Sequence, residues 1–182
     1  MLLGMVVLFA ATSESAALVF PVLELNPVTV TGTTSGITMT GAAPFIFSDS
    51  TTILTDFSPD LAFSLTSDVS GSGSLLVDGG SVLSATFSNL AVVHLFSGNV
   101  SWDAALTYTG GSLAGSLASG RIKGVFAGVG GFTGVQSLLG ADFSASGGIA
   151  KIGAVVPVPA AVWLFGSGLL GMAVVARRKS AA

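Results

Sequence analysis

Few residues of this 182-residue chain could do acid–base or metal chemistry. It has one histidine, His94, and no cysteine, so the usual zinc ligand sets of Cys and His cannot be assembled. His94 lies in the apolar run 91–96, which favours the role of a satisfied or half-exposed structural residue over that of a general base. The nearest approach to a nucleophile elbow, Gly110-Gly111-Ser112-Leu113-Ala114, ends in Ala where that motif has Gly. We therefore predict that the protein is not an enzyme and has no catalytic residue, metal site or cofactor.

The carboxylates are the remaining candidates for chemistry. They lie four or more residues apart, unlike the dense Asp spacing of an EF-hand loop. Asp49, Asp56, Asp60 and Asp78 fall in predicted turns, where they could converge on Ca²⁺, although hydrogen bonding to the turn is the usual role of such residues. A hydrolase acting through two Asp residues would need a carboxylate pair within about 10 Å, which a sequence does not reveal.

The charge balance argues against one class of partner. Residues 18–156 carry eight acidic and three basic side chains, which gives a net charge of −5. Three cations are too few to form the basic patch that phosphate contacts require. We expect no nucleic-acid partner.

The elements that position these residues are predicted to be short strands. Val100 to Thr109 alternates between apolar and polar side chains, and Gly110-Gly111 supplies a turn after it. The same period of two occurs in 61–66 and 83–88. The further strand candidates are shorter: 28–31, 45–47, 53–57, 75–77, 91–96, 122–126 and 142–145.

Turn residues separate these segments at regular intervals. About ten short strands predict an all-β domain made of two packed antiparallel sheets or a barrel, and we expect an antiparallel β-sandwich or jelly-roll-like domain over residues 18–154. Most of the twelve Phe residues are expected in its core. Gly128 to Gly134 is glycine-rich and fits either a loop or closely packed strands. The predicted turns are Gly71-Ser72-Gly73, Asp78-Gly79-Gly80, Ser97-Gly98-Asn99 and Gly147-Gly148.

Trp102 and Tyr108 are the candidate ligand contacts of this domain. The alternation places both on the buried face, but a register shifted by one residue would expose Trp102, which could then stack on a sugar. A carbohydrate-binding β-sandwich module is therefore one alternative function.

Both ends of the chain are predicted to be targeting segments. Residues 2–11 form an apolar run of the length of a signal-peptide core, and small residues follow it, so we predict a signal peptide over residues 1–17 that is cleaved after Ala17. No basic residue precedes Glu14, which suggests a true start further upstream. The alternative is a buried strand or helix.

The C-terminal end has three successive parts over residues 155–182. Pro157 and Pro159 precede the seventeen uncharged residues 160–176, a helix of about 25 Å if it spans a membrane. Arg177-Arg178-Lys179 then form a membrane stop that holds the C-terminus in the cytoplasm. We predict one transmembrane helix at 160–176, with the domain before Pro157 outside.

This order of parts resembles the PEP-CTERM protein-sorting signal. The short motif is Val156-Pro157-Val158-Pro159-Ala160, and the apolar run that follows includes Trp163 and the small residues of 166–171. Val158 stands where the family name has Glu, and the Val-Pro-hydrophobic-Pro-Ala sequence resembles a variant of the signal. The resemblance covers about one seventh of the chain.

The resemblance implies a function in export. In that family, an exosortase, which is an integral-membrane cysteine transpeptidase of Gram-negative bacteria, recognises the Pro motif, removes the helix and passes the protein outward. Such proteins are linked to extracellular polysaccharide and biofilm matrix. The expectation is a non-catalytic exported protein, first anchored through 160–176 and later at the cell surface or outside. A permanent C-terminal anchor is the alternative, because it needs only the helix and the cations.

Overall fold

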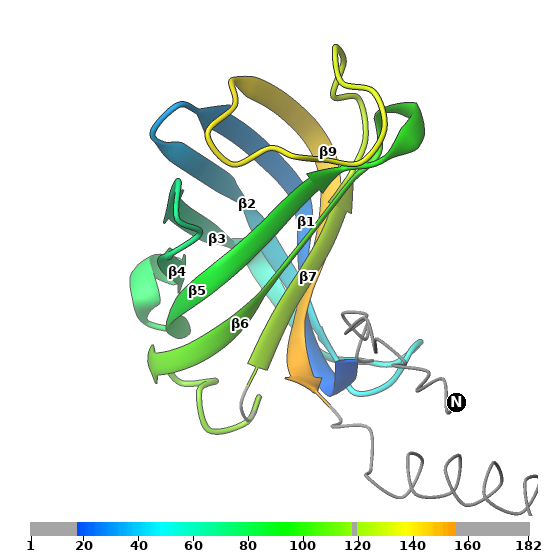
Figure 1. The fold of residues 1–182 in the computed structure, drawn as a ribbon. Helices are drawn as coiled ribbons and strands as arrows, with labels where there is room; N and C mark the ends of the chain where they lie inside the picture. The colour runs from blue at the N-terminus through cyan, green and yellow to red at the C-terminus, as the bar shows by residue number, and fades with distance from the viewer. Residues whose placement is uncertain (1–17, 118–119, 156–182) are drawn as a thin grey trace, which may run out of the picture. The chain divides into compact units, whose positions relative to one another are not determined.

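A computed structural model describes residues 18–117 and 120–155, which form a closed antiparallel β-barrel (Figure 1). In these two ranges no helix has the length and apolarity needed to cross a membrane. The predicted signal peptide and the sorting segment from Val156 onward lie outside the described residues.

The barrel is an up-and-down meander. Each long strand pairs with the next one along the chain, and the last strand pairs with the first, so eight strands form a ring. The strands are β1 (Leu18–Thr33), β2 (Gly36–Phe47), β3 (Ile53–Asp68), β4 (Gly73–Val77), β5 (Leu83–His94), β6 (Val100–Gly110), β7 (Gly120–Phe126), β8 (Gln136–Ser137) and β9 (Phe143–Val155). Two single 3-10 turns, η1 (Asp78–Gly80) and η2 (Phe96–Gly98), lie between strands. The very short β8 pairs with β5 beyond the end of β4.

The prediction of an all-β antiparallel domain is confirmed, but the sandwich or jelly-roll arrangement is wrong. A sandwich has two separate sheets, whereas here β4 pairs with both β3 and β5, and β9 pairs with both β7 and β1. The physical reason is that successive ring strands pair with one another, so the sheet closes on itself without a Greek-key crossover.

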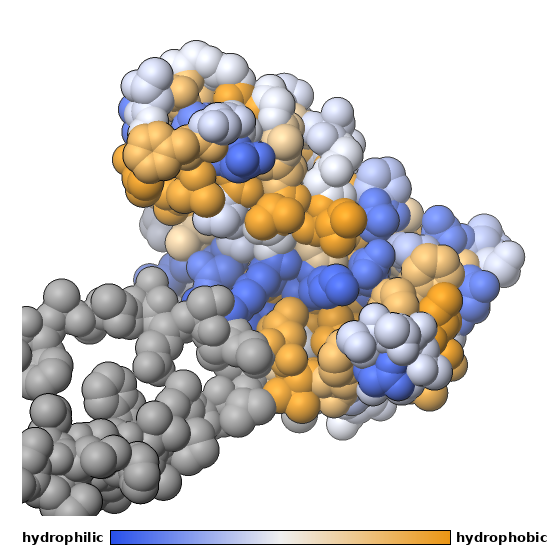
Figure 2. Space-filling model, turned by 90° about the vertical axis from the view of Figure 1, so that its right-hand side faces the viewer, coloured by the Kyte–Doolittle hydropathy of each residue, from blue (hydrophilic) through white to orange (hydrophobic). Residues whose placement is uncertain are grey.

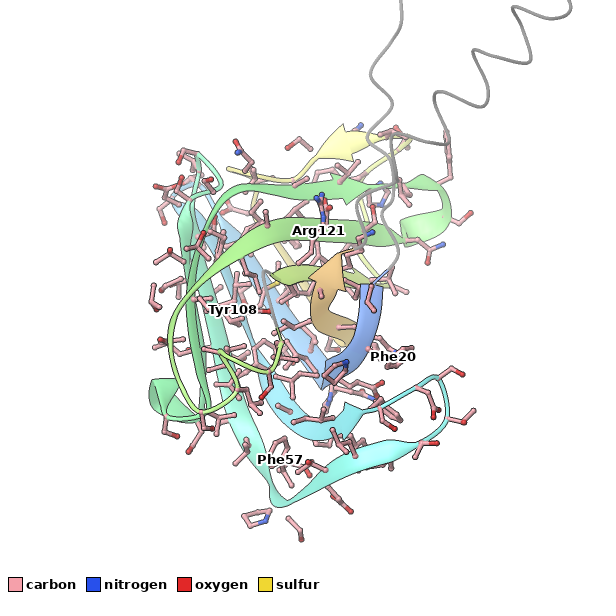
Figure 3. All side chains as sticks on the ribbon, turned by 90° about the horizontal axis from the view of Figure 1, so that it is seen from below. Phe20, Phe57, Tyr108 and Arg121 are labelled. Atoms are coloured by element: carbon pink, nitrogen blue, oxygen red, sulfur yellow. The ribbon has the colours of Figure 1, made fainter. Side chains whose placement is uncertain are left out.

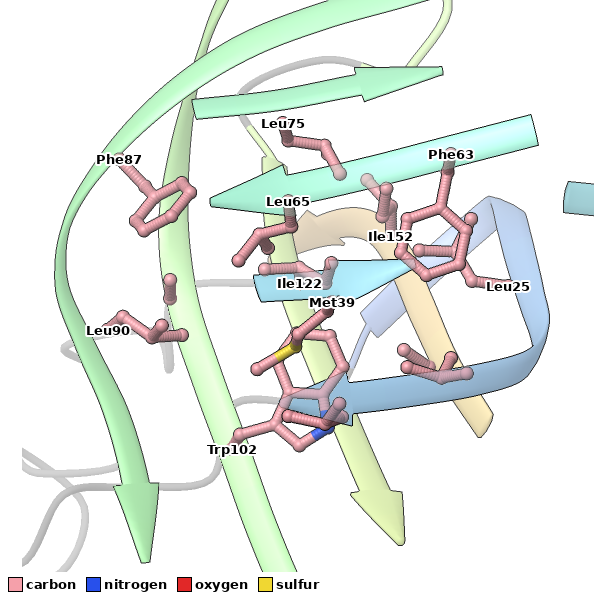
Figure 4. Close-up of a cluster of buried hydrophobic side chains, with 14 of the residues drawn as sticks. Leu25, Met39, Phe63, Leu65, Leu75, Phe87, Leu90, Trp102, Ile122 and Ile152 are labelled. Carbon is pink, nitrogen blue, oxygen red and sulfur yellow. The ribbon is translucent and has the colours of Figure 1, made fainter. Parts of the chain in front are cut away.

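The core fills the inside of the barrel. Alternate residues of every long strand point inward, as in β1, where Leu23 and Leu25 are buried and Glu24 between them is not. An eight-stranded barrel is just wide enough for side chains to fill it. Figure 4 shows part of this core, including Met39, Trp102 and Ile122.

Several predicted short strands are halves of one long strand, joined through local irregularities. In β5, Asn89 has a left-handed φ of 62° where the register with β6 shifts, which interrupts the alternation between 83–88 and 91–96. Gly147-Gly148 was predicted to be a turn, and this is wrong. The pair lies inside β9, where Gly147 has a φ of 73° beside a register shift against β1.

The hairpin predicted at Asp78-Gly79 is confirmed. Both residues have positive φ, 50° and 62°, as in the turns that favour tight hairpins, and Val77 pairs with Leu83 across the turn.

Candidate functional site

Trp102 lies inside the barrel, with only 2% of its surface exposed. Its indole covers Gly124, its direct cross-strand partner on β7. The indole Nε1 is buried and has no hydrogen-bond partner among the described residues. The register that would expose Trp102 is therefore not the one formed. A sugar cannot stack on Trp102 from the outer surface, which corrects that candidate contact.

Tyr108 is half-buried near the C-terminal end of the same strand, β6, and Figure 3 labels it. A Cβ built on Gly120 would lie 2.5 Å from its Cζ and closer to the hydroxyl, so the phenol occupies space that only glycine leaves free. The hydroxyl has no partner within the described part of the chain, and burial raises the pKa of Tyr108 to about 12. Both predicted ligand contacts thus pack against glycines of β7.

His94 is buried where β5 ends, and it holds the glycine-rich segment after β7. Its Nδ1 lies 3.3 Å from the carbonyl oxygen of Gly134 and its Nε2 lies 3.2 Å from that of Val129. The ring also packs against Phe132, with 5.4 Å between centroids. A neutral imidazole donates a hydrogen bond from only one of its two nitrogens. In either neutral tautomer, His94 therefore donates to one of these two carbonyl oxygens. This geometry favours the structural role, and the segment it holds is a loop.

Of the four Asp residues predicted to lie in turns, Asp49 and Asp78 do, but Asp56 and Asp60 lie within β3, which corrects that prediction. Asp49 accepts hydrogen bonds from the amides of Thr51 and Thr52, and these bonds lower the pKa of Asp49 to about 2. Asp68 accepts hydrogen bonds from the hydroxyl of Ser70 and from the amides of Ser72 and Ser70, and these bonds lower the pKa of Asp68. In residues 18–117 and 120–155, no three His, Asp or Glu side chains come together in a way that could hold a metal ion. The convergence of turn Asp residues on Ca²⁺ is therefore not seen in these residues.

Charged side chains gather instead on the outer face of β6, β7, β9 and β1. The strand registers place Asp103 opposite Lys123, Lys123 opposite Lys151, and Lys151 opposite Glu24. Their sequence neighbours on each strand are inward-facing core residues, so the four side chains point outward in one row. Arg121 joins the row beside Asp103. These five residues are called the charged band: Glu24, Asp103, Arg121, Lys123 and Lys151.

Members of the charged band form ion pairs with one another. Arg121 donates to Asp103 Oδ2 from its Nε at 2.8 Å and from a second guanidinium nitrogen, and Figure 3 labels Arg121. Lys151 Nζ lies 3.5 Å from Glu24 Oε2. The Lys151 side chain is 49% exposed whereas that of Glu24 is 14% exposed. The band therefore presents an ammonium group to solvent above a largely covered carboxylate.

Aromatic rings extend the charged band onto β2. Phe45 lies directly opposite Glu24, and the rings of Phe45 and Phe47 meet edge to face at 6.0 Å. The Nζ of Lys151 lies 5.6 Å from the centroid of Phe47, within the range of a cation–π contact. Both rings point outward because Ile46 between them is buried in the core. Of the ten Phe residues in the described ranges, only Phe63, Phe87 and Phe126 are buried core residues, so the expectation that most Phe residues lie in the core is wrong.

Figure 2 shows the side of the molecule at the right of Figure 1, where a hydrophilic band crosses the surface between hydrophobic patches. The charged band contains every Lys and Arg of residues 18–155, while six carboxylates of that range lie elsewhere. The positive side chains of an otherwise acidic barrel are thus gathered on one face.

The charged band was not predicted from the sequence. One signal was present, because Arg121 and Lys123 alternate with the apolar Ile122 and so share the outward face of a strand. Comparison with protein-family models finds no match for this chain, and comparisons with curated proteins and with solved structures find none either.

Proposed function

We propose that this chain is an exported, non-catalytic protein that is sorted by an exosortase-type enzyme and retained at the cell surface or in the extracellular matrix. The observation that carries the proposal is the ordered tail: the motif Val156-Pro157-Val158-Pro159-Ala160, the apolar run 160–176 and the basic cluster 177–179. The enzyme would read the Pro motif while the apolar run holds the precursor in the membrane and the cations stop its translocation.

The limits of the barrel support this proposal. Leu18 pairs with Val155, so the sheet closes between the first and last described residues, and residues 18–155 form a compact unit with their own core. The predicted signal cleavage lies just before Leu18, and the Pro motif begins just after Val155. Removal of both targeting segments would therefore leave every strand of the barrel in place.

The chemistry of the barrel supports a non-catalytic role. His94 is turned to two backbone carbonyls, and Asp49 and Asp68 accept hydrogen bonds from their own turns. Groups engaged in this way hold structure rather than transfer protons to a substrate.

The test is a variant with both Pro157→Ala and Pro159→Ala, expressed in a bacterium that has the sorting enzyme. We expect the double variant to stay in the membrane fraction at the mass of the precursor, while the wild type is released in a shorter form. Met172→Leu, a conservative change in the apolar run, is the matched control and should be released like the wild type. Equal release of the double variant would refute recognition of the Pro motif. Retention of all three proteins at precursor mass would favour the permanent anchor.

A second candidate function, carbohydrate binding, is favoured by the charged band and its aromatic end. The ring of Phe47 beside the Lys151 ammonium places an aromatic face next to a hydrogen-bond donor on an open surface, and sugars are commonly bound by such a combination. This candidate no longer depends on Trp102 or Tyr108. Its direct test is a change in the chemical shifts of the barrel when soluble oligosaccharides are added.

A further inference from the structure

We infer that the charged band is a binding site for a carboxylate-bearing polysaccharide, with Lys123 and Lys151 holding a sugar carboxylate and Phe47 contacting a ring face. This inference deepens the second candidate function and rests on it. It is independent of the sorting proposal.

The first argument is the unfavourable position of the two lysines. Lys123 and Lys151 are direct partners across β7 and β9, where side chains at facing positions have Cβ atoms about 5 Å apart, and like charges at such positions destabilise a sheet. Asp103 and Glu24 flank the pair on either side, so the row reads negative, positive, positive, negative. A site that breaks a local stability rule is a candidate for function. Lys151 is paired with Glu24, and a bound carboxylate would give the two lysines a further acceptor that they can share.

The second argument concerns the type of anion. The barrel carries a net charge of −5, and its positive groups are confined to the charged band. A dense polyanion such as a nucleic acid would meet repulsion on either side of the band. In a polysaccharide whose carboxylate-bearing sugars are separated by neutral sugars, a single negative group can lie over the lysine pair. The neutral sugars on either side then lie over the neighbouring surface.

The third argument is the shape of the surface. The charged band, together with Phe45 and Phe47, runs across the strands rather than along one strand. From β6 to β2 it covers four strand spacings, or about 19 Å. Phe45 and Phe47 lie at its β2 end, where the CH face of a sugar can pack on a ring. An open strip of this length, with charge at its centre and aromatic rings at one end, suits an extended polymer.

The test uses the barrel, residues 18–155, which contains both partners of the closing strand pair and its own core. Binding of a hyaluronan oligosaccharide, in which neutral sugars separate the carboxylate-bearing ones, is measured by calorimetry at low and at physiological salt. A neutral dextran oligomer of similar length is the comparison. We expect binding of the hyaluronan oligosaccharide that weakens with salt, and little binding of the dextran. The variant with Lys123→Gln and Lys151→Gln should lose about tenfold or more in affinity, because it lacks both charged donors.

Two control variants separate a site from a general effect of charge. Lys123→Arg with Lys151→Arg keeps both charges and should keep most of the affinity. Asp142→Lys adds positive charge at an exposed position outside the charged band and should not restore binding to the Gln variant. Circular dichroism and the fluorescence of Trp102, the single tryptophan of this fragment, verify that each variant is folded.

The contradicting outcomes differ in what they overturn. Equal binding of dextran and the hyaluronan oligosaccharide would leave carbohydrate binding in place and refute the role of the carboxylate. Unchanged affinity in the Gln variant would refute the charged band as the site. Absence of binding to either sugar would refute both this inference and the carbohydrate function, without affecting the sorting proposal. Self-association of the wild type that the Gln variant loses, measured by sedimentation, would assign the band to contacts between copies instead.

Discussion

The contact between Trp102 and Gly124 gives the sharpest prediction about the barrel. A Cβ on Gly124 would lie 2.5 Å from Trp102 Cζ2 and closer to Cε2 and Nε1, whereas carbon atoms pack at about 3.5–4.0 Å. The indole is enclosed by the core, so Gly124→Ala forces the ring or the strand to move. Overpacking of this kind costs about 1–3 kcal/mol, and the lower entropy of the unfolded Ala variant offsets about 0.5 kcal/mol.

Gly124→Ala should therefore lower the free energy of unfolding by about 0.5–2.5 kcal/mol, which for a domain of this size lowers Tm by about 2–10 °C. The measurement is thermal and urea unfolding of residues 18–155, followed by circular dichroism. Gly130→Ala is the control, because a Cβ at Gly130 meets nothing within 4 Å and its φ is not positive. Its stability should stay within about 0.5 kcal/mol of the wild type.

A double-mutant cycle tests the cause. Trp102→Phe removes the part of the ring that lies over Gly124, so the Ala substitution should cost less in the Phe background, with a coupling of about 1 kcal/mol. Additive effects of the two changes, or a Gly124→Ala variant as stable as Gly130→Ala, would refute the proposed packing role of this glycine.

Three further predictions concern single polar groups. His94→Phe removes the donor that the carbonyls of Val129 and Gly134 share. The backbone amides of residues 127–137 should therefore exchange faster in hydrogen-exchange mass spectrometry. Unchanged protection of these amides would contradict the structural role of His94. The pKa of Asp49 is about 2 in the folded state and 3.8 ordinarily, so the contribution of Asp49 to stability is present above about pH 4 and is lost as the pH falls towards 2. The Asp49→Asn variant should therefore show a flatter dependence of Tm on pH between pH 4 and pH 2. A pH profile identical to that of the wild type would refute this role of Asp49. The pKa of Tyr108 is raised from 10.0 to about 12, so its contribution is present below pH 10 and is lost as the pH rises through 12. Because Tyr108 is the only tyrosine, absorbance at alkaline pH should report the ionisation of its phenol near pH 12. Tyr108→Phe should abolish that signal with little loss of stability, because the hydroxyl has no partner within the described part of the chain. A titration near pH 10 would contradict the burial of Tyr108.

Much of the local fold could be predicted because alternation determines which side of a strand is buried. The segment from Val100 to Thr109 matches β6, and the turns at Asp78-Gly79 and Ser97-Gly98-Asn99 match the connections on either side of β5. The extent of the other strands was underestimated, because a bulge changes the period without ending the strand. Asn89 in β5 and Gly147 in β9 both have positive φ, and both resemble turn residues in a sequence.

The candidate site could not be predicted in the same way. Lys123 and Lys151 are far apart in the sequence, and they become neighbours only because β7 pairs with β9 after the chain has passed through the loop and β8. Strand order between non-consecutive segments depends on how the whole sheet closes. Of the two aromatic residues predicted as ligand contacts, Trp102 is buried against Gly124 and Tyr108 is half-buried against Gly120. Glycine on the neighbouring strand gives each large ring room to turn inward.

The mass of the protein released from producing cells tests the central claim most directly. Intact-mass spectrometry of the released wild-type protein should give a chain that begins at Leu18 and ends close to the Pro motif, without the residues from Trp163 to Lys179. A released protein that still carries those residues would contradict the proposal that the tail is a sorting signal removed during export.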